Sequence, residues 1–171
     1  DKNMVTRETS SCYYLAFNQK NRLFKNLKIR QAISMAVNRD QLTKKILGDG
    51  SFNSQSFVSK GLSINPKTGK DFTATTAKPA SMTYNPTKAK ALWKQGLKEL
   101  GISKMHFTLL SSDEFAQKQV SEYLQSQLQQ NLPGLTVSLR NIPFQTLLSR
   151  QKTHNYQVTM ADWYADFADP I

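Results

Sequence analysis

The second half of the chain alternates strand patterns with helix patterns, and this order restricts the fold more than any other feature of the sequence. Apolar runs predict strands at Met105–Leu110, Leu135–Leu139 and Tyr156–Met160. Apolar residues at helical spacing fill the two segments between these strands. This strand–helix–strand–helix–strand order is typical of right-handed crossovers and a largely parallel sheet. We therefore predict an α/β fold with a mixed, largely parallel sheet and flanking helices.

Capping residues predict where the helices of this half begin and end. Ser111 and Glu114 have the spacing of a capping box, which predicts a helix N-terminus at Ser111. Pro143 is expected to begin the second helix, which ends near Lys152. His154 then leads through a turn into the last strand.

The first half predicts one strand, three helices and a long loop. The apolar run Ser11–Asn18 is expected to form a strand that is buried on both faces, with Cys12 as a core thiol. Residues 48–83 are rich in Gly, Ser, Thr, Asn, Lys and Pro, and we expect them to form a long irregular loop packed over the surface by its few aromatic residues.

The helices of the first half are predicted from their caps. Asn26 is expected to cap a helix, and Asp40 a second, short helix that ends at Gly48. Asn85 is expected to cap a third helix, with Pro86 in its first turn and Gly101 as its stop. Trp93 lies on the apolar face of this third helix, so we expect it to pack in the core.

The formal net charge of +11 suggests a nucleic-acid-binding domain as one alternative. The distribution of the charge argues against it. Residues 1–104 contain 19 Lys and Arg against 6 Asp and Glu, whereas residues 105–171 contain 4 against 6. The excess is mostly lysine spread along the first half, which is more typical of solvated surfaces than of an arginine-rich stripe that binds nucleic acid. We therefore expect no nucleic-acid partner.

The sequence offers little for catalysis, metal binding or membrane insertion. It has no nucleophile-elbow, zinc-protease, phosphate-loop or dinucleotide-binding motif, so we expect no enzyme and no catalytic residue. Cys12 is the only cysteine, and no Cys and His cluster has metal-binding spacing, so we expect no metal site and no cofactor. No apolar run approaches the ~20 residues of a transmembrane helix.

The last stretch, Tyr156–Pro170, is the strongest candidate for a binding site. It contains Trp163, Tyr164 and the carboxylates of Asp162, Asp166 and Asp169, with no basic residue among them. Aromatic surface beside uncompensated carboxylates suits a cationic organic ligand. A carboxylate in partly apolar surroundings, such as Asp166, either pairs with a cation or is driven towards neutrality.

Ligands of parallel α/β sheets bind beyond the carboxyl ends of the strands. Three such ends are expected to converge here: one at Asn18, one around Ser112 and one that begins at Met160. We therefore expect the side chains at these three ends to line a common site.

Four segments of the chain resemble the peptide and nickel solute-binding family of ABC transporters, whose best-known members bind oligopeptides outside the cell. The segments are Phe24–Leu42 (FKNLKIRQAISMAVNRDQL), Tyr84–Trp93 (YNPTKAKALW), the strand–helix–strand of residues 105–139, and Trp163–Pro170 (WYADFADP). They occur in the family's order and span nearly the whole chain. Members of this family that bind nickel or haem remain an alternative, because these segments do not select the ligand.

The resemblance implies a type II periplasmic-binding-protein-like fold and a set of ligand-binding residues. Asp166 would pair with the N-terminal ammonium of a peptide, and Trp163, with Tyr164 beside it, would line a side-chain pocket. Tyr14 and Asn18, on the strand before the first helix, would contribute aromatic or main-chain contacts. Met160 stands where some members have an arginine that helps to bind the peptide. Its place here favours a longer or more apolar peptide.

The resemblance also implies an organisation and a location. Residues 1–171 are expected to form a single excised lobe, on the C-terminal side of a two-lobed protein whose other half completes the site. The intact protein would pass its ligand to the membrane subunits of an ABC permease. We expect it at the cell surface, anchored by a lipid to a Gram-positive membrane.

Overall fold

The computed structural model describes residues 11–51, 53–54 and 62–164, and its centre is a four-stranded sheet. The sheet order is β1-β4-β2-β3, from β1 (Ser11–Phe17), β2 (Met105–Ser112), β3 (Leu135–Ile142) and β4 (Val158–Tyr164). β2 runs parallel to β3 and to β4, whereas β1 is antiparallel to β4. The predicted mixed, largely parallel sheet is therefore confirmed.

β1 differs from the prediction because it lies at the edge of the sheet. Among the described strands it pairs with β4 alone, and none of its residues is fully buried. Tyr13 is 58% exposed, and Cys12 is half-buried. The predictions of a strand buried on both faces and of a core thiol are wrong, since the apolar residues of an edge strand reach the core on one side only.

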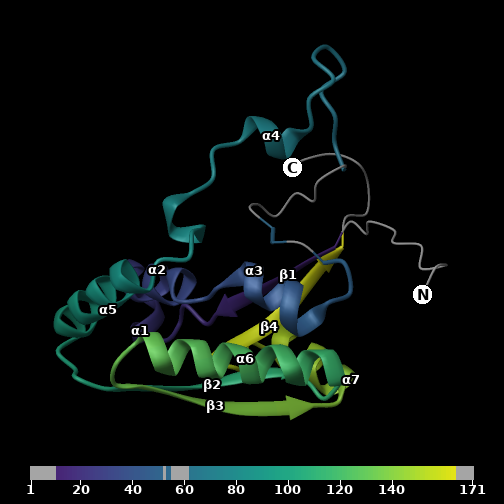
Figure 1. Cartoon of the computed structure of the whole chain (residues 1–171). Helices are drawn as coiled ribbons and strands as arrows, with labels where there is room; N and C mark the ends of the chain where they lie inside the picture. Colours follow the sequence, from purple (N-terminus) through teal and green to yellow (C-terminus); the bar gives the residue numbers. More distant parts are fainter. Residues whose placement is uncertain (1–10, 52, 55–61, 165–171) are drawn as a thin grey trace.

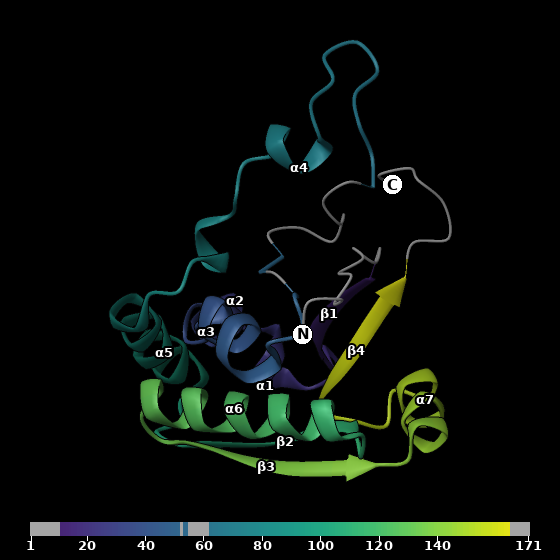
Figure 2. The same cartoon turned by 45° about the vertical axis from the view of Figure 1, so that its right-hand side comes forward.

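The sheet twists strongly between β2 and β4. These two strands pair only through Leu109 with Val158 and Leu110 with Thr159. Figures 1 and 2 show β4 turning away from the plane of β2 and β3 and rising at its carboxyl end. The carboxyl end of β4 is therefore separated from those of its parallel neighbours.

The turns after β1 are organised by asparagine caps. The side chains of Asn21, Asn26 and Asn38 accept main-chain hydrogen bonds at the starts of α1 (Arg22–Lys25), α2 (Leu27–Met35) and α3 (Arg39–Gln41), as Asn26 was expected to do. The cap expected at Asp40 is wrong, because Asn38 fills that position and Asp40 lies inside the first turn. A π-helical segment follows as η1 (Leu42–Leu47) and ends at Gly48, whose φ of 59° fits the predicted glycine stop.

The described parts of the long segment after Gly48 have little regular structure. It contains the single turn α4 (Phe72–Thr75), the 3₁₀ turn η2 (Ala80–Met82) and an isolated bridge between Ile64 and Asp71. Figure 1 shows α4 standing away from the helices that cover the sheet, so α4 does not lie packed over the surface as expected. Of the aromatic residues expected to hold the loop down, Phe52 and Phe57 lie outside the described residues.

α5 (Pro86–Leu100) has the predicted ends. The Asn85 side chain accepts from the Lys88 main-chain N–H at 2.9 Å, and Gly101 has the left-handed conformation, with φ of 71°. Trp93 is 1% exposed, and its Nε1–H donates to the main-chain oxygen of Pro133 at 2.8 Å, so the predicted core position is confirmed. α5 packs on α2 beside Gly96.

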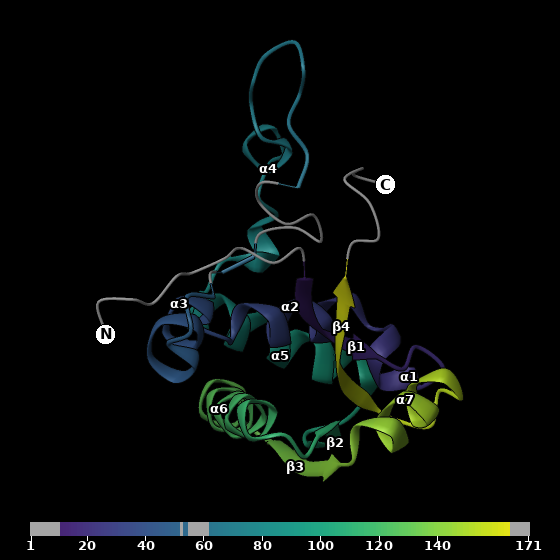
Figure 3. The same cartoon turned by 90° about the vertical axis from the view of Figure 1, so that its right-hand side faces the viewer.

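The two helices of the second half are present, with α6 (Phe115–Asn131) starting later than expected and α7 (Phe144–Lys152) close to its predicted bounds. The predicted cap at Ser111 is wrong, since β2 continues through Ser112 in register with β3. Figure 3 shows α6 over β2 and β3, on the same side of these strands as α2 and α5, with α7 beside their far end. The buried core lies between α2, α5, α6 and the sheet. Its largest fully buried side chains are Trp93, Phe24, Phe107, Ile29, Ile33, Leu109 and Leu128.

Candidate ligand-binding site

The carboxyl end of β4 and the first residues of β1 form one exposed edge. Antiparallel pairing places Trp163 opposite Cys12, and Tyr164 opposite Ser11. Trp163 is half-buried, whereas Tyr164 is 58% exposed. The structure therefore brings two predicted site residues, Trp163 and Tyr164, to the surface at the end of a strand.

Tyr13 and Asp162 belong to this edge, although the sequence did not single out Tyr13. Tyr13 pairs with Asp162, and Asp162 and Tyr164 are two residues apart on β4, so all three side chains lie on the same face. Burial raises the pKa of Tyr13. Its interaction with Tyr164, which includes a hydrogen bond, raises this pKa further, and so do the nearby carboxylates of Asp162 and Glu114. The edge thus combines phenol groups with acidic groups, which suits a ligand that carries hydrogen-bond donors or positive charge.

Tyr14 lies on the same strand but on the opposite face from Tyr13. It pairs with Ala161, one residue before Asp162, and is half-buried. Tyr14 thus lies on the strand next to β4, and its role as a ligand contact stays a prediction.

Asn18 lies at the other end of β4, so the predicted convergence of three carboxyl ends is wrong for this residue. Its main-chain N–H donates to Gln157, which precedes β4, at 2.9 Å. Its Nδ2 donates to the main-chain oxygens of His154 and Tyr156, at 3.1 and 2.9 Å. The reason is the antiparallel direction of β1, which brings the end of β1 to the start of β4. Asn18 therefore connects the end of β1 with the residues that lead into β4.

Ser112 ends β2, whereas Met160 lies inside β4, and both have almost no exposed surface, at 0% and 4%. The Asn141 amide donates to the main-chain oxygen of Ser112 at 3.2 Å, and the Ser112 hydroxyl accepts from the Glu114 main-chain N–H at 3.3 Å. The Gln151 amide donates to the main-chain oxygen of Met160 at 3.0 Å. Both residues are therefore buried parts of the sheet, and Ser112 lies at the end of β2, away from the carboxyl end of β4.

Asp166 and Asp169 lie outside the described residues. Within the described ranges, no group of three or more His, Cys, Asp and Glu side chains is placed to hold a metal ion. No helix among these residues is long and apolar enough to cross a membrane.

Comparison with known proteins identifies the class to which this fold and edge belong. The α/β lobe superimposes on a solved structure described as Listeria monocytogenes OppA bound to peptide, with a TM-score of 0.90 and 36% identity over 95% of this chain and 32% of that one. A family model described as bacterial extracellular solute-binding proteins, family 5 Middle, matches residues 1–171. The chain therefore belongs to this family of extracellular solute-binding proteins, and the resemblance found in the sequence is confirmed.

Two curated relatives carry related descriptions. The chain is 42% identical over 146 residues to a dipeptide-binding protein of Lactococcus lactis subsp. cremoris, covering 85% of this chain and 26% of the relative. It is 31% identical over 165 residues to the dipeptide-binding protein DppE of Bacillus subtilis, covering 96% of this chain and 30% of the relative. The chain thus spans less than a third of the length of these relatives. They are described as binding proteins, and nothing in these matches favours nucleic-acid binding.

Proposed function

We propose that the chain forms the C-terminal-side lobe of the substrate-binding component of an ABC importer, which binds oligopeptides non-covalently between two lobes and catalyses no reaction. Membership of the extracellular solute-binding family supports this function. So do the relatives described as dipeptide-binding and the similar structure described as bound to peptide.

One structural observation carries the proposal: the outer part of β4 has a free edge. β4 pairs with β1 along its whole length, but with β2 only at Val158 and Thr159. Beyond Thr159, no strand described in this structure pairs with β4 on the side of β2. The Met160 main-chain oxygen accepts from the Gln151 amide, so the part of this edge left for a peptide begins after Met160. An extended peptide adds to such an edge through main-chain hydrogen bonds, and neighbouring side chains then provide selectivity.

The side chains around this free edge suit the rest of a peptide. Tyr164 and Tyr13 offer exposed aromatic surface on one face, and Trp163, on the opposite face of β4, is half-buried. We assign Trp163 to a side-chain pocket and Asp166 to the peptide's ammonium group. Both roles rest on the likeness of residues 163–170 to the family motif. Tyr14 is proposed as an aromatic contact. Ser112 and Met160 are buried, so they would support the site from within the sheet and not touch the ligand. Asn18 would contribute by holding β1 and β4 together.

The test is calorimetric titration of the full-length protein that contains this chain with tripeptides. Asp166→Asn removes the charge but keeps the shape, and a charge-assisted pair is worth about 1.5–3 kcal/mol. Asp166→Asn is therefore expected to weaken peptide binding about 10- to 100-fold. Asp113→Asn, at an exposed position after β2, makes the same charge change elsewhere and is expected to leave affinity unchanged. Equal affinity of the wild type and Asp166→Asn would refute the assignment.

We also propose that the intact protein works at the cell surface, held by a lipid anchor on a Gram-positive membrane, and delivers peptides to ABC permease subunits. The similarity to proteins of Lactococcus, Bacillus and Listeria supports this setting. Labelling of cells with a clickable fatty acid tests the anchor, and an unlabelled full-length protein would contradict it.

A further inference from the structure

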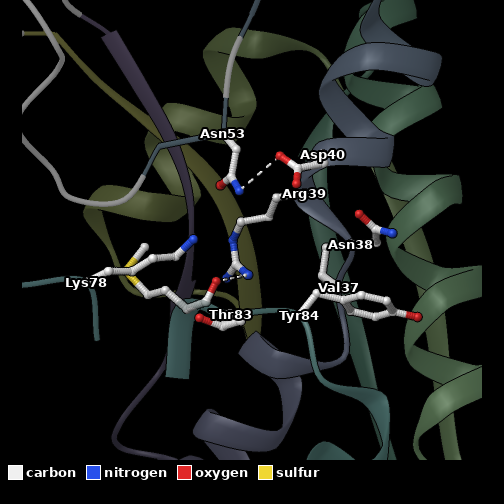
Figure 4. Close-up of a pocket in the computed structure, with 9 residues that line it drawn as sticks. Val37, Asn38, Arg39, Asp40, Asn53, Lys78, Thr83 and Tyr84 are labelled. Atoms are coloured by element: carbon white, nitrogen blue, oxygen red, sulfur yellow. Dashed lines mark hydrogen bonds between the residues drawn. The ribbon is translucent and has the colours of Figure 1, made fainter. Parts of the chain in front are cut away.

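A hollow lies between α3 and the segment that leads into α5. Its volume is about 280 Å³. Figure 4 shows its lining, which combines cationic and amide side chains with few carboxylates. The lining residues are Val37, Asn38, Arg39, Asp40, Asn53, Lys78, Met82, Thr83 and Tyr84.

Arg39 is the central cation of this pocket, and it is held rigidly. Its Nη1 donates to the main-chain oxygens of Ser34 and Met82 at 3.0 and 3.2 Å, and its Nη2 donates to Ser34 Oγ at 2.9 Å. A guanidinium has five N–H donors, so two have no acceptor among the described residues. Burial lowers the pKa of Arg39, and no described carboxylate forms an ion pair with it. A partly desolvated cation without a counter-ion favours an anionic ligand.

Two further polar groups line the same space. Lys78 brings a second cation from the long segment, and within the described chain it also lacks an ion-pair partner. Asn53 donates through Nδ2 to Asp40 Oδ1 at 3.3 Å, while its Oδ1 is buried and receives no hydrogen bond from any described group. A buried acceptor without a donor is costly, so it favours a ligand that carries an N–H or O–H.

We propose that this pocket binds a small organic carboxylate that carries an N–H beside the carboxylate group, the chemistry of an N-acylated amino acid or of the C-terminal residue of a peptide. Arg39 and Lys78 bind the carboxylate, and Asn53 Oδ1 accepts the neighbouring N–H. The inference does not depend on peptide binding at the edge of β4.

The negative charge on the pocket wall selects between anions. Asp40 lines the pocket and is exposed. It would repel a dianion such as phosphate more strongly than a monoanion. The pocket volume of about 280 Å³ also restricts the ligand to a small molecule with few non-hydrogen atoms besides its carboxylate group.

The probe is N-acetyl-L-alanine, and N-acetyl-L-alaninamide is its neutral match. Both are titrated into the full-length protein that contains this chain and followed by saturation-transfer difference NMR. The acid is expected to bind saturably and the amide at least tenfold more weakly. Lys78→Met is expected to weaken binding of the acid about tenfold, because it removes one charge-assisted hydrogen bond from a partly exposed site. Asn53→Asp, which puts a second carboxylate in the pocket, is expected to abolish binding.

The control is Lys67→Met, an exposed lysine of the same long segment that does not line the pocket. Equal affinity for the acid in Lys78→Met and Lys67→Met would overturn the proposal, as would equal binding of the acid and the amide by the wild type. Competition by trialanine, but not by its C-terminal amide, would support the pocket with the peptide C-terminus as its ligand. Simultaneous binding of trialanine and N-acetyl-L-alanine would support the pocket as a separate site whose ligand is a small carboxylic acid and not the peptide.

Discussion

The close contact of α2 with α5 at Gly96 makes a quantitative prediction. A Cβ atom at position 96 would lie 2.7 Å from Ile29 Cδ1 and 2.9 Å from Ile29 Cγ1, whereas ordinary contacts begin at 3.4 Å. It would also lie 3.3 Å from Oδ1 of Asn26, which caps α2. Ile29 is 0% exposed, so its side chain has no free space at the surface into which to move.

Two opposing effects set the size of the change caused by Gly96→Ala. Alanine is about 0.8–1 kcal/mol more favourable than glycine inside a helix. Overpacking of a close-packed interior costs about 1–3 kcal/mol. Strain on the Asn26 cap adds to that cost, since the loss of such a cap is worth about 0.5–2 kcal/mol. We expect a net loss of about 1 kcal/mol in the free energy of unfolding, or a Tm lower by about 2–4 °C.

A double-mutant cycle, measured by urea unfolding, separates steric overlap from other causes. Ile29→Val removes the Cδ1 atom that the new methyl group would meet but keeps Cγ1, which would lie 2.9 Å away. Gly96→Ala is therefore expected to cost clearly less in the Ile29→Val background than in the wild type. Ile33→Val is the matched control: Ile33 is also buried on α2, but is not among the nearest atoms to the new Cβ. Additive effects in both backgrounds, or stabilisation by Gly96→Ala alone, would refute the reasoning.

Three further predictions concern the helices. Trp93→Phe leaves the main-chain oxygen of Pro133 without its donor and opens a small cavity, so it is expected to cost about 1–3 kcal/mol in urea unfolding; an unchanged midpoint would contradict the buried hydrogen bond. Asn85→Ala removes the cap of α5 and is expected to cost about 1 kcal/mol, while Asn85→Ser restores most of that loss. The hydrogen bond from Lys28 lowers the pKa of Glu99, so the carboxylate stabilises the fold above its unfolded pKa and loses that effect as pH falls through its folded pKa. The difference in unfolding midpoint between the wild type and Glu99→Gln should therefore be present at pH 7 and shrink towards pH 3, whereas a pH-independent difference would argue against the charge effect.

The sequence predicted features that depend on neighbouring residues better than features that depend on distant pairing. The ends of α5 follow from Asn85, Pro86 and Gly101, which act on the backbone beside them, and the structure confirms all three. Ser111 has the local spacing of a cap, but β3 extends the sheet past it, and the Asn141 amide donates to the Ser111 hydroxyl at 2.7 Å. Tertiary pairing therefore overrides the local capping signal.

The candidate site was predicted in part for the same reason. The sequence predicted a last strand over Tyr156–Met160, whereas β4 runs from Val158 to Tyr164 and so places Asp162 and Tyr164 on one face. The direction of β1 is not readable in the sequence, because an apolar run of this kind suits either a parallel or an antiparallel neighbour. That direction moves Asn18 to the far end of β4 and brings Tyr13 beside Asp162.

The central claim, that this lobe binds peptides and that the Asp166 carboxylate pairs with the peptide's ammonium group, is tested most directly by changing the peptide. Calorimetry of the full-length protein that contains this chain compares trialanine with N-acetyl-trialanine, which lacks the N-terminal charge. We predict that acetylation weakens binding about 10- to 100-fold in the wild type and has little further effect in Asp166→Asn. Equal affinity of the two peptides for the wild type would contradict the account.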